Sequence, residues 1–352
     1  MTPSPKTSIT RRSVAKGRLE LPTFGFGGAD LGGRVRAFSE AEAEETLRSA
    51  WELGVRYFDT APWYGLGASE HRVGHLLRER ARDEFVVSTK VGRVLRPDSQ
   101  RPAPGSPESL WHSALPYGVA FDYSYDGIMR SYEDSLQRLG LARVDVLFVH
   151  DLDSYYHTPD SVFDIYLRQL ETSGWRALTS LRDANEVGAI GFGINERGHV
   201  KRFAEMFSPD VLLVAGTYTL VDQHGLDELD YCASAGVDVV IGSPFRGGLF
   251  TDLSSRDASL GPGASADDQR ISSIAAVCRE FNVSSLGAAL QFPLAHPSVV
   301  SVVVGVASSE EIQEDVQANE ASIPASFWDH LRVAGLVSRS APLPTSREAD
   351  HA

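Results

Sequence analysis

The amino-acid sequence predicts an α/β fold in which strands alternate with helices and close into a parallel barrel. Eight short apolar runs rich in β-branched residues recur along the chain, each followed by a longer amphipathic stretch. Several runs are apolar at almost every position, as in strands covered on both faces. This count, without a break into two halves, favours a closed (β/α)8 TIM barrel over an open sheet. The expected strands are Leu21–Phe26, Val55–Phe58, Phe85–Thr89, Val144–Val149, Ala189–Phe192, Val211–Ala215, Val237–Ile241 and Val299–Val304.

Composition favours one barrel with short tails. The chain has 352 residues, of which 42% are hydrophobic, so a large core can form without a disulfide or a metal. We expect the barrel to occupy residues 19–336, with flexible tails at 1–18 and 337–352. No apolar run follows Arg11 and Arg12, which argues against export and favours the cytoplasm.

The charge balance narrows the possible partners. Asp and Glu number 47 against 33 Lys and Arg, a formal net charge of −14. Such a surface repels a phosphate backbone, so we do not expect nucleic acid as a partner. No stretch approaches 18 uninterrupted apolar residues, so we expect no membrane span. A small molecule remains the expected partner of a monomer or small homo-oligomer.

Helical patterns follow the strands. Apolar residues share one face in the stretches 128–139 and 271–281, and Gly140 ends the first. Ser69 is a candidate N-cap for the next helix after the second strand. Cys232 and Cys278 lie on predicted helices without a Cys-x-x-Cys motif, which predicts buried thiols in a reducing compartment.

Two segments interrupt the alternation of strands and helices. Residues 91–124 are rich in Pro, Gly, Ser and aromatic residues, and follow the third strand on the C-terminal face, where barrel active sites are built. Residues 251–268 are rich in Ser, Gly and Asp, and are expected to form a loop that can close over a ligand.

Polar residues stand where three of the expected strands end. Asp59, Lys90 and His150 each follow an apolar run, and Tyr64 lies five residues after Asp59. Asp59 with Lys90 alone is compatible with a structural ion pair, and His150 alone with a core histidine. Because strand ends converge in a barrel, the four together favour a catalytic site.

These four residues suit carbonyl–alcohol chemistry. An opposite charge within about 4–6 Å lowers the pKa of an acid by roughly 1–3 units. We therefore expect the Lys90 ammonium, oriented by Asp59, to lower the pKa of Tyr64 from its ordinary value near 10. Tyr64 would then transfer the proton, and His150 would orient the reacting oxygen. The hydride requires a nicotinamide.

The segment Phe58-Asp59-Thr60-Ala61-Pro62-Trp63-Tyr64-Gly65 closely resembles the active-site motif of the aldo-keto reductase superfamily. The resemblance covers roughly residues 19–335, including 88–90, 144–150 and 305–315. It implies a barrel, a nicotinamide cofactor and an Asp59, Tyr64, Lys90 and His150 tetrad. The cofactor contacts that we expect are Gly27, Gly28, Ala29, Asp59, Asn195, Ser243, Phe245, Arg246, Gly247, Gly248, Gly305, Ser309, Glu311 and Asp315.

The expected substrate contacts are aromatic or catalytic. Trp63 matches a family position that usually faces the substrate, although plain packing is the alternative. Phe121 and Tyr123 on the long loop are further candidates, beside Tyr64 and His150.

Three positions depart from the family pattern. The Asn expected after the fifth strand is displaced by one residue to Asn195. Ala215-Gly216-Thr217 replaces the Gln expected after the sixth strand. Gly242 stands where an aromatic residue often stacks on the nicotinamide.

The segment after the eighth strand favours NAD over NADP. Glu311 occupies a position where Arg or Gln usually meets the 2′-phosphate in the family. A carboxylate repels a phosphate and can accept hydrogen bonds from ribose hydroxyls. The alternative is that Glu311 only caps a helix.

Within the superfamily, residues 121–131 and 218–223 resemble the branch of L-fucose and D-threo-aldose 1-dehydrogenases, which has pyridoxal-oxidising relatives. The resemblance implies oxidation of an anomeric hydroxyl to a lactone with Tyr64 as base. Oxidation of pyridoxal at C4, reduction of aldehydes or ketones, and a cofactor-sensing regulatory subunit are the alternatives. His71 and His75 share a helix face, but no third ligand is apparent, so we expect no metal.

Overall fold

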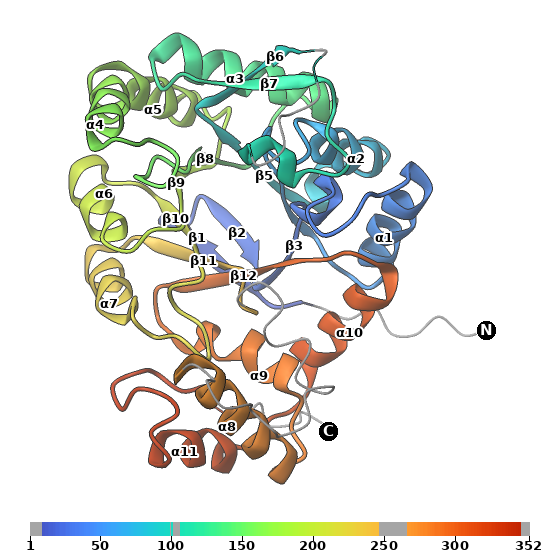
Figure 1. Cartoon of the computed structure of the whole chain (residues 1–352), viewed down its shortest axis with the longest axis vertical. Coiled ribbons are helices and arrows are strands. Elements are labelled where there is room, and N and C mark those ends of the chain that lie inside the picture. Colours follow the sequence, from blue (N-terminus) through green and yellow to red (C-terminus); the bar gives the residue numbers. More distant parts are fainter. Residues whose placement is uncertain (1–8, 99, 101–105, 246–265, 346–352) are drawn as a thin grey trace.

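The computed structural model describes residues 9–98, 100, 106–245 and 266–345. Its centre is a closed barrel with the strand order β10-β11-β12-β3-β4-β5-β8-β9, and every neighbouring pair is parallel (Figure 1). The predicted barrel is therefore confirmed. Its strands are β3 (Phe24–Gly27), β4 (Tyr57–Asp59), β5 (Val86–Val91), β8 (Val146–His150), β9 (Ala189–Ile194), β10 (Val211–Ala215), β11 (Asp238–Gly242) and β12 (Val299–Gly305).

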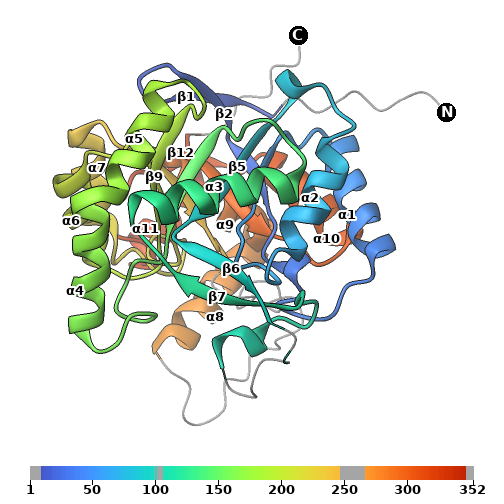
Figure 2. The ribbon, with the colours of Figure 1, turned by 90° about the horizontal axis from the view of Figure 1, so that it is seen from above.

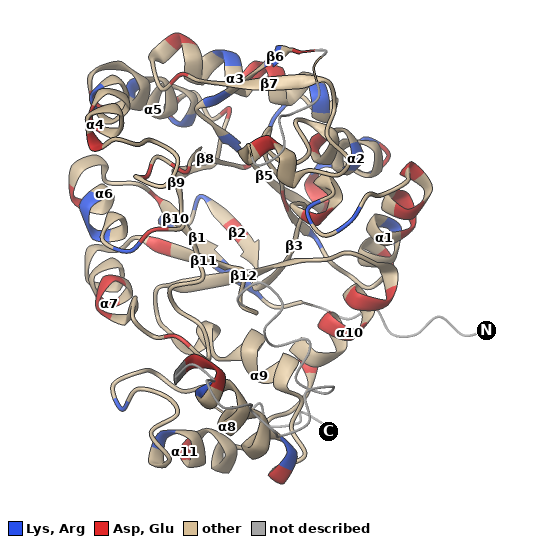
Figure 3. Cartoon of the chain, viewed as in Figure 1, with Lys and Arg blue, Asp and Glu red and all other residues tan. Residues whose placement is uncertain are grey.

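Helices surround this barrel, and their apolar faces are buried against the strands. Gly140 takes a left-handed φ of 63° and ends α3, as the sequence predicts. Acidic side chains lie on outer helices such as α1 and α10 (Figure 3). The helices are α1 (Glu40–Glu52), α2 (Ala68–Leu77), α3 (Tyr125–Leu139), α4 (Asp160–Gln169), α5 (Trp175–Asp183), α6 (His199–Phe207), α7 (Leu226–Ala235), α8 (Ala266–Glu280), α9 (Ser285–Gln291), α10 (Ser309–Glu320) and α11 (Ala325–Val333).

A hairpin closes the N-terminal end of the barrel. β1 (Arg11–Val14) pairs antiparallel with β2 (Leu19–Pro22), and Val14 and Leu21 join the apolar cluster inside the barrel. The expected strand Leu21–Phe26 is thus two strands separated at Thr23, because one continuous apolar run serves both. The prediction of a flexible tail is wrong for Arg11–Val14, because this segment is paired strand.

The C-terminal segment also packs on the barrel beyond the predicted boundary. Val337 and Ala341 are buried, and Arg332 donates a hydrogen bond to the Ala341 carbonyl at 2.7 Å. The tail prediction is therefore wrong for this part, while residues 1–8 and 346–352 lie outside the described residues.

A second hairpin lies at the opposite end of the barrel, on the C-terminal face (Figure 2). β6 (Arg93–Pro97) pairs antiparallel with β7 (Tyr117–Phe121), and the turn η3 (Pro107–Leu110) lies between them. The expected loop at 91–124 is therefore partly regular structure. Of the second expected loop, residues 251–265 lie outside the described part.

The helix after β4 begins differently from the prediction. Gly67 is the N-cap of α2, with a φ of 100°, and Ser69 lies inside the helix. The Ser69 hydroxyl donates to the Gly28 carbonyl at 2.7 Å and contacts the Thr60 hydroxyl at 2.8 Å. Ser69 therefore ties α2 to the ends of β3 and β4. Both thiols, Cys232 and Cys278, are buried and free, as expected.

Candidate active site

The four expected catalytic residues come together at the C-terminal ends of neighbouring strands. Asp59 ends β4, Lys90 lies near the end of β5, and His150 ends β8. The ring centroid of Tyr64 lies 4.7 Å from Lys90 Nζ and 5.7 Å from the His150 ring, which it meets edge to face. The barrel thus places a phenol between an ammonium and an imidazole.

A buried ion pair holds Lys90. Its Nζ donates to Asp59 Oδ2 at 2.6 Å and to the Thr60 carbonyl at 3.0 Å. The other Asp59 oxygen accepts from Ser88 Oγ at 2.6 Å. Burial opposes the charge on Lys90, but Asp59 and Tyr64 outweigh it, so the pKa of Lys90 lies above its ordinary value. Lys90 therefore remains an ammonium beside Tyr64.

The expected lowering of the Tyr64 pKa is wrong for this structure. Burial raises the pKa of Tyr64 more than the charge and hydrogen bond of Lys90 lower it, and Asp59 raises it further. The sequence shows the cation but not how much water the fold excludes. Tyr64 therefore keeps its proton at neutral pH and is a proton donor in the protein without ligand.

His150 is a neutral imidazole. Burial, Arg93 and Lys90 together hold the pKa of His150 well below its ordinary value. The Tyr123 hydroxyl donates to the His150 carbonyl at 3.1 Å and contacts His157 Nε2 at 2.9 Å. Tyr123 is completely buried, so it supports His150 from behind, contrary to the expected contact with a substrate.

Aromatic side chains line the expected substrate side. Trp63 meets Trp111 edge to face with ring centroids 5.7 Å apart, and Trp111 lies 5.8 Å from the Tyr64 ring. Phe121, on β7, is half-buried and contacts His157. The long segment after β5 thus supplies a hairpin and, through Trp111 and Phe121, part of an aromatic wall that also contains Trp63 and Tyr156.

The expected cofactor residues gather at the ends of β3 and β12. Gly27 and Gly305 are paired in register, and Ala29 precedes the turn η1 (Asp30–Gly32). A Cβ at Gly28 would lie 2.5 Å from Ser69 Oγ, and one at Gly305 would lie 2.4 Å from Asp30 Oδ2. Gly28, which also lies 3.0 Å from the Asp59 carbonyl oxygen by the same measure, is therefore closely packed at this edge, whereas the Asp30 side chain could move away from a Cβ at Gly305.

The end of β10 leaves open space. A Cβ at Gly216 would meet no atom within 4 Å, whereas one at Gly242, at the end of β11, would lie 3.3 Å from Leu213 Cδ2, which is a tight contact. A planar ring fits such a surface, so the residues present are compatible with a nicotinamide there. Ser243 follows with a φ of 51°, and Phe245 is buried. Arg246, Gly247 and Gly248 lie outside the described residues.

The start of α10 carries the remaining expected cofactor residues. Ser308 caps the helix by accepting from the Glu311 N–H, and Ser309 is its first residue. Glu311 Oε2 accepts from the Ala307 N–H at 2.7 Å. One of the two carboxylate oxygens therefore has the helix-capping role that was the alternative to a cofactor contact. Asp315 is buried one turn further on, and burial together with Glu311 raises its pKa to about 8.

Asn195 differs from the expectation. Its Nδ2 donates to Asp151 Oδ1 at 2.6 Å, so this amide is directed at a carboxylate instead of an open cofactor site. Sequence reasoning missed Asp151 and its ion-pair partner Arg93. Asp151 directly follows the end of β8, and Arg93 begins β6 two residues after β5 ends, so the closeness of both to strand ends was the signal that could have found them.

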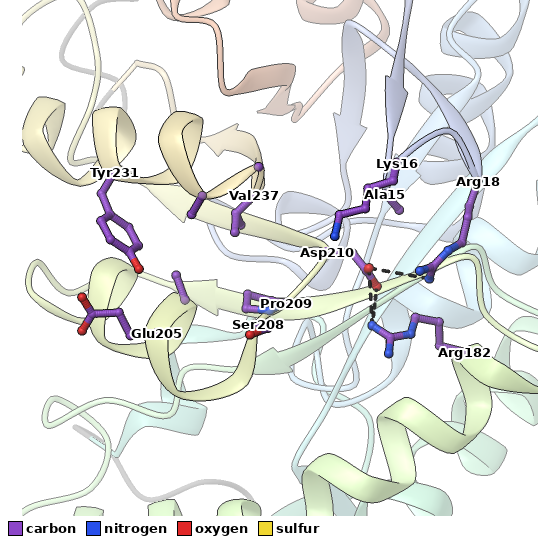
Figure 4. A pocket seen from close by; sticks show the side chains of 13 residues that line it. Ala15, Lys16, Arg18, Arg182, Glu205, Ser208, Pro209, Asp210, Tyr231 and Val237 are labelled. Carbon is purple, nitrogen blue, oxygen red and sulfur yellow. Dashed lines mark hydrogen bonds and ion pairs between the residues drawn. The ribbon is translucent and has the colours of Figure 1, made fainter.

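A cavity of about 470 Å³ lies at the other end of the barrel, between the β1–β2 turn and the loops before β10 and β11 (Figure 4). Barrel enzymes build their active sites on the C-terminal face, so this cavity is no candidate active site. In the described part of the chain, no three His, Cys, Asp or Glu side chains are grouped to hold a metal, and no helix could cross a membrane.

Fold and site together define an oxidoreductase that interconverts carbonyls and alcohols. A model of the aldo/keto reductase family matches residues 23–334, and the chain belongs to this family, whose members use nicotinamide cofactors. It is 37% identical to pyridoxal 4-dehydrogenase of Microbacterium luteolum, over 93% of this chain and 98% of the relative.

Two further comparisons agree with this assignment. D-threo-aldose 1-dehydrogenase of a Pseudomonas species is also 37% identical, over 94% of this chain and 99% of the relative. An aldo-keto reductase structure from Bacillus halodurans matches with a TM-score of 0.68 at 24% identity, over 95% of this chain and 98% of that one.

Proposed function

We propose that the protein is an NAD-dependent dehydrogenase that oxidises the anomeric hydroxyl of an aldose to a lactone. The observation that carries the proposal is the gathered tetrad in a chain 37% identical to D-threo-aldose 1-dehydrogenase. The branch-like segments 121–131 and 218–223 support the same substrate class.

The residues divide the work of the reaction. Oxidation removes a hydride from the anomeric carbon and a proton from its hydroxyl, and the ring oxygen stays bonded to the new carbonyl carbon. A bound oxidised nicotinamide would supply the acceptor for the hydride. Tyr64 in its phenolate form takes the proton, and the Lys90 ammonium stabilises that phenolate. Neutral His150 hydrogen-bonds the reacting oxygen and orients it.

Acidic residues at the expected adenosine end support NAD over NADP. Asp30, Glu311 and Asp315 lie near one another, since Glu311 contributes to the raised pKa of both aspartates, beside the larger effect of burial. With a pKa of about 8, Asp315 is mostly protonated at neutral pH, so the Glu311 carboxylate is the charge that would repel a 2′-phosphate, whereas ribose hydroxyls can donate to it.

A substrate panel tests the proposal. Purified protein is assayed with NAD and with NADP on L-fucose, L-galactose, D-arabinose and pyridoxal. We expect turnover of an aldose and a kcat/KM that is higher with NAD. No turnover of any aldose would overturn the sugar assignment, and a higher kcat/KM with NADP would overturn the cofactor assignment.

Pyridoxal is the second candidate substrate. The equal identity to pyridoxal 4-dehydrogenase and the aromatic wall of Trp63 and Trp111, which suits a flat ring, favour it. Turnover of pyridoxal alone in the same panel would select this function.

The cofactor preference has its own variant test. Glu311→Gln is expected to raise kcat/KM for NADP about tenfold, because it removes a charge from the phosphate side. Glu310→Gln, which removes the same charge from the same helix turn, is the matched control. Equal effects of the two variants would show that only net charge matters and that Glu311 has no specific part.

A further inference from the structure

Next to His150 the structure holds a buried ion pair that the family motifs do not include. Arg93 Nη2 donates to Asp151 Oδ2 at 2.7 Å, and the two side chains are only 1% and 7% exposed. Isolating two charges from water costs several kcal/mol each, and apolar residues of similar size are often as stable. A contribution to stability therefore does not explain this buried ion pair.

Asp151 connects the pair to His150. Its Oδ2 lies 3.3 Å from His150 Nε2, and its Oδ1 accepts from Asn195 Nδ2 at 2.6 Å. Its backbone φ of 43° is left-handed, a conformation that costs a non-glycine residue roughly 1–3 kcal/mol. This backbone turn brings the carboxylate within 3.3 Å of His150 Nε2.

The two nitrogens of His150 have different surroundings. Nδ1 is buried and has no hydrogen-bond partner in the described part of the chain, while Nε2 lies 3.3 Å from Asp151 Oδ2 as an ion-pair contact without hydrogen-bond geometry. A buried N–H without an acceptor costs about 1–3 kcal/mol, so a proton on Nδ1 is disfavoured. The nearby negative charge of Asp151 favours a proton on Nε2 electrostatically, and the N–H itself stays free to donate to a ligand. The neutral ring therefore carries its hydrogen on Nε2.

Arg93 fixes the carboxylate and joins it to the substrate wall. Its guanidinium lies 4.2 Å from the Tyr156 ring centroid, 4.6 Å from that of Trp63 and 5.4 Å from that of Phe121. Trp63 in turn meets Tyr156 edge to face at 6.3 Å. Arg93 thus contacts both the Asp151 carboxylate and these aromatic rings.

We propose that Arg93 and Asp151 are positioning residues that hold His150 in the Nε2–H tautomer and in register with the aromatic wall. The inference rests on the proposed oxidoreductase function, because the Nε2–H is the donor that orients the reacting oxygen. Asp151 acts through His150, and Arg93 acts through Asp151.

The charges that face His150 predict how each variant changes its titration. Lys90 from β5 and Arg93 from β6 disfavour the imidazolium, while Asp151 favours it, and Tyr64 and Tyr123 face the ring or its carbonyl as neutral phenols. Burial raises the pKa of Asp151, and Arg93 opposes that rise. Without Arg93, the pKa of Asp151 should be higher and its side chain less often ionised.

The test reads the tautomer directly. Protein labelled with ¹⁵N-histidine is examined by NMR with and without NAD, and His150→Gln assigns the signal. We expect a neutral Nε2–H ring from pH 6 to 9 in the unmodified protein, and a mixture of tautomers in Asp151→Ala. An Nδ1–H ring in the unmodified protein would overturn the proposal.

Kinetics on L-fucose with NAD provide the second readout. Asp151→Ala should lower kcat about 10²-fold, the loss expected when a reacting group is misplaced, with a smaller change in KM. Asp151→Asn keeps an acceptor oxygen and should recover kcat to within about tenfold of the unmodified protein. Arg182→Met, which breaks the ion pair with Asp210 at the opposite end of the barrel, is the matched control.

A double variant separates positioning from folding. Arg93→Met with Asp151→Leu replaces the buried pair by apolar side chains and should unfold at the same urea concentration as the unmodified protein, yet lose kcat and the Nε2–H signal. Retention of both would overturn the proposal. Absence of turnover on every substrate would contradict the proposed function alone, since the NMR readout needs no substrate.

Discussion

The two ends of the barrel each hold an aspartate–arginine pair, but the neighbours of the two aspartates differ. At the N-terminal end, Asp210 accepts from Arg182 and from the Ile190 N–H at 3.1 Å, and it lies 3.6 Å from Arg18 (Figure 4). At the C-terminal end, His150 Nδ1 and Asp153 Oδ2 are buried without a hydrogen-bond partner among the described residues. A saturated group contributes to stability alone, whereas an unsatisfied one beside a catalytic residue remains available to a ligand.

The hairpins that cover the two ends of the barrel also differ. The β1–β2 hairpin seals the N-terminal end with Val14 and Leu21, both completely buried. The β6–β7 hairpin instead presents Arg93 and a half-buried Phe121 to the site. One cover therefore completes the core, and the other forms a wall of the active site.

The largest expected effect comes from the removal of one oxygen atom at the C-terminal end of the barrel. Tyr64→Phe should lower kcat about 10²–10⁴-fold, because it removes the group that transfers the proton. NAD binding, measured by calorimetry, should stay within about threefold. Tyr231→Phe, beside the N-terminal cavity, makes the same chemical change and should leave kcat unchanged. Full activity in Tyr64→Phe would contradict the mechanism, and an inactive unmodified protein that binds NAD would favour the sensor alternative.

Stability distinguishes the two ends next. Lys90→Met leaves Asp59 buried without its cation, which costs about 3–5 kcal/mol of unfolding free energy. Arg182→Met should cost about 1 kcal/mol, because Asp210 keeps Arg18 and the Ile190 N–H. Urea unfolding followed by circular dichroism measures both. Equal losses of unfolding free energy would mean that Asp59 needs Lys90 no more than Asp210 needs Arg182.

Strand ends made most of the site readable from sequence. Asp59, Lys90 and His150 could be placed because apolar runs precede them and parallel strands converge at one end. Arg93 and Asp151 follow the same ends but carry no motif, so nothing in one sequence shows that they pair. The raised pKa of Tyr64 was not predictable either, since burial is a property of the whole fold and outweighs the visible charge of Lys90.

Predictions from local sequence patterns were wrong where the same pattern is compatible with two different structures. The boundary between β2 and β3 was hidden because Leu21 and Pro22 at the end of β2 are buried, as is all of β3. Ser69 has the residue type of an N-cap, but its hydroxyl is used to bind the Gly28 carbonyl. The β6–β7 hairpin was obscured because Pro and Gly in its long connection dominate the composition of the segment.

The pH dependence of the reaction tests the raised pKa of Tyr64 at the C-terminal end of the barrel. Oxidation needs the Tyr64 phenolate, and burial holds the pKa of Tyr64 above its ordinary value. The rate of oxidation at saturating substrate should therefore rise about tenfold per pH unit between pH 7 and 9, since each unit raises the phenolate fraction tenfold. Reduction, which needs the protonated phenol, should stay constant over this range. A plateau of oxidation below pH 8 would place the Tyr64 pKa below the value that burial requires.

The smallest expected effect concerns the hairpin that seals the N-terminal end. Val14→Ala removes two buried methyl groups from the cluster inside the barrel and should cost about 1.5 kcal/mol of unfolding free energy. Val35→Ala, at a residue 66% exposed, removes the same groups from water contact and should change stability by less than about 0.5 kcal/mol. Because Val14 lies at the end opposite Tyr64, kcat in the folded variant should equal that of the unmodified protein. A loss of kcat at temperatures where Val14→Ala is fully folded would show that the seal positions the strands that carry the tetrad, and the two ends would then be coupled through the barrel.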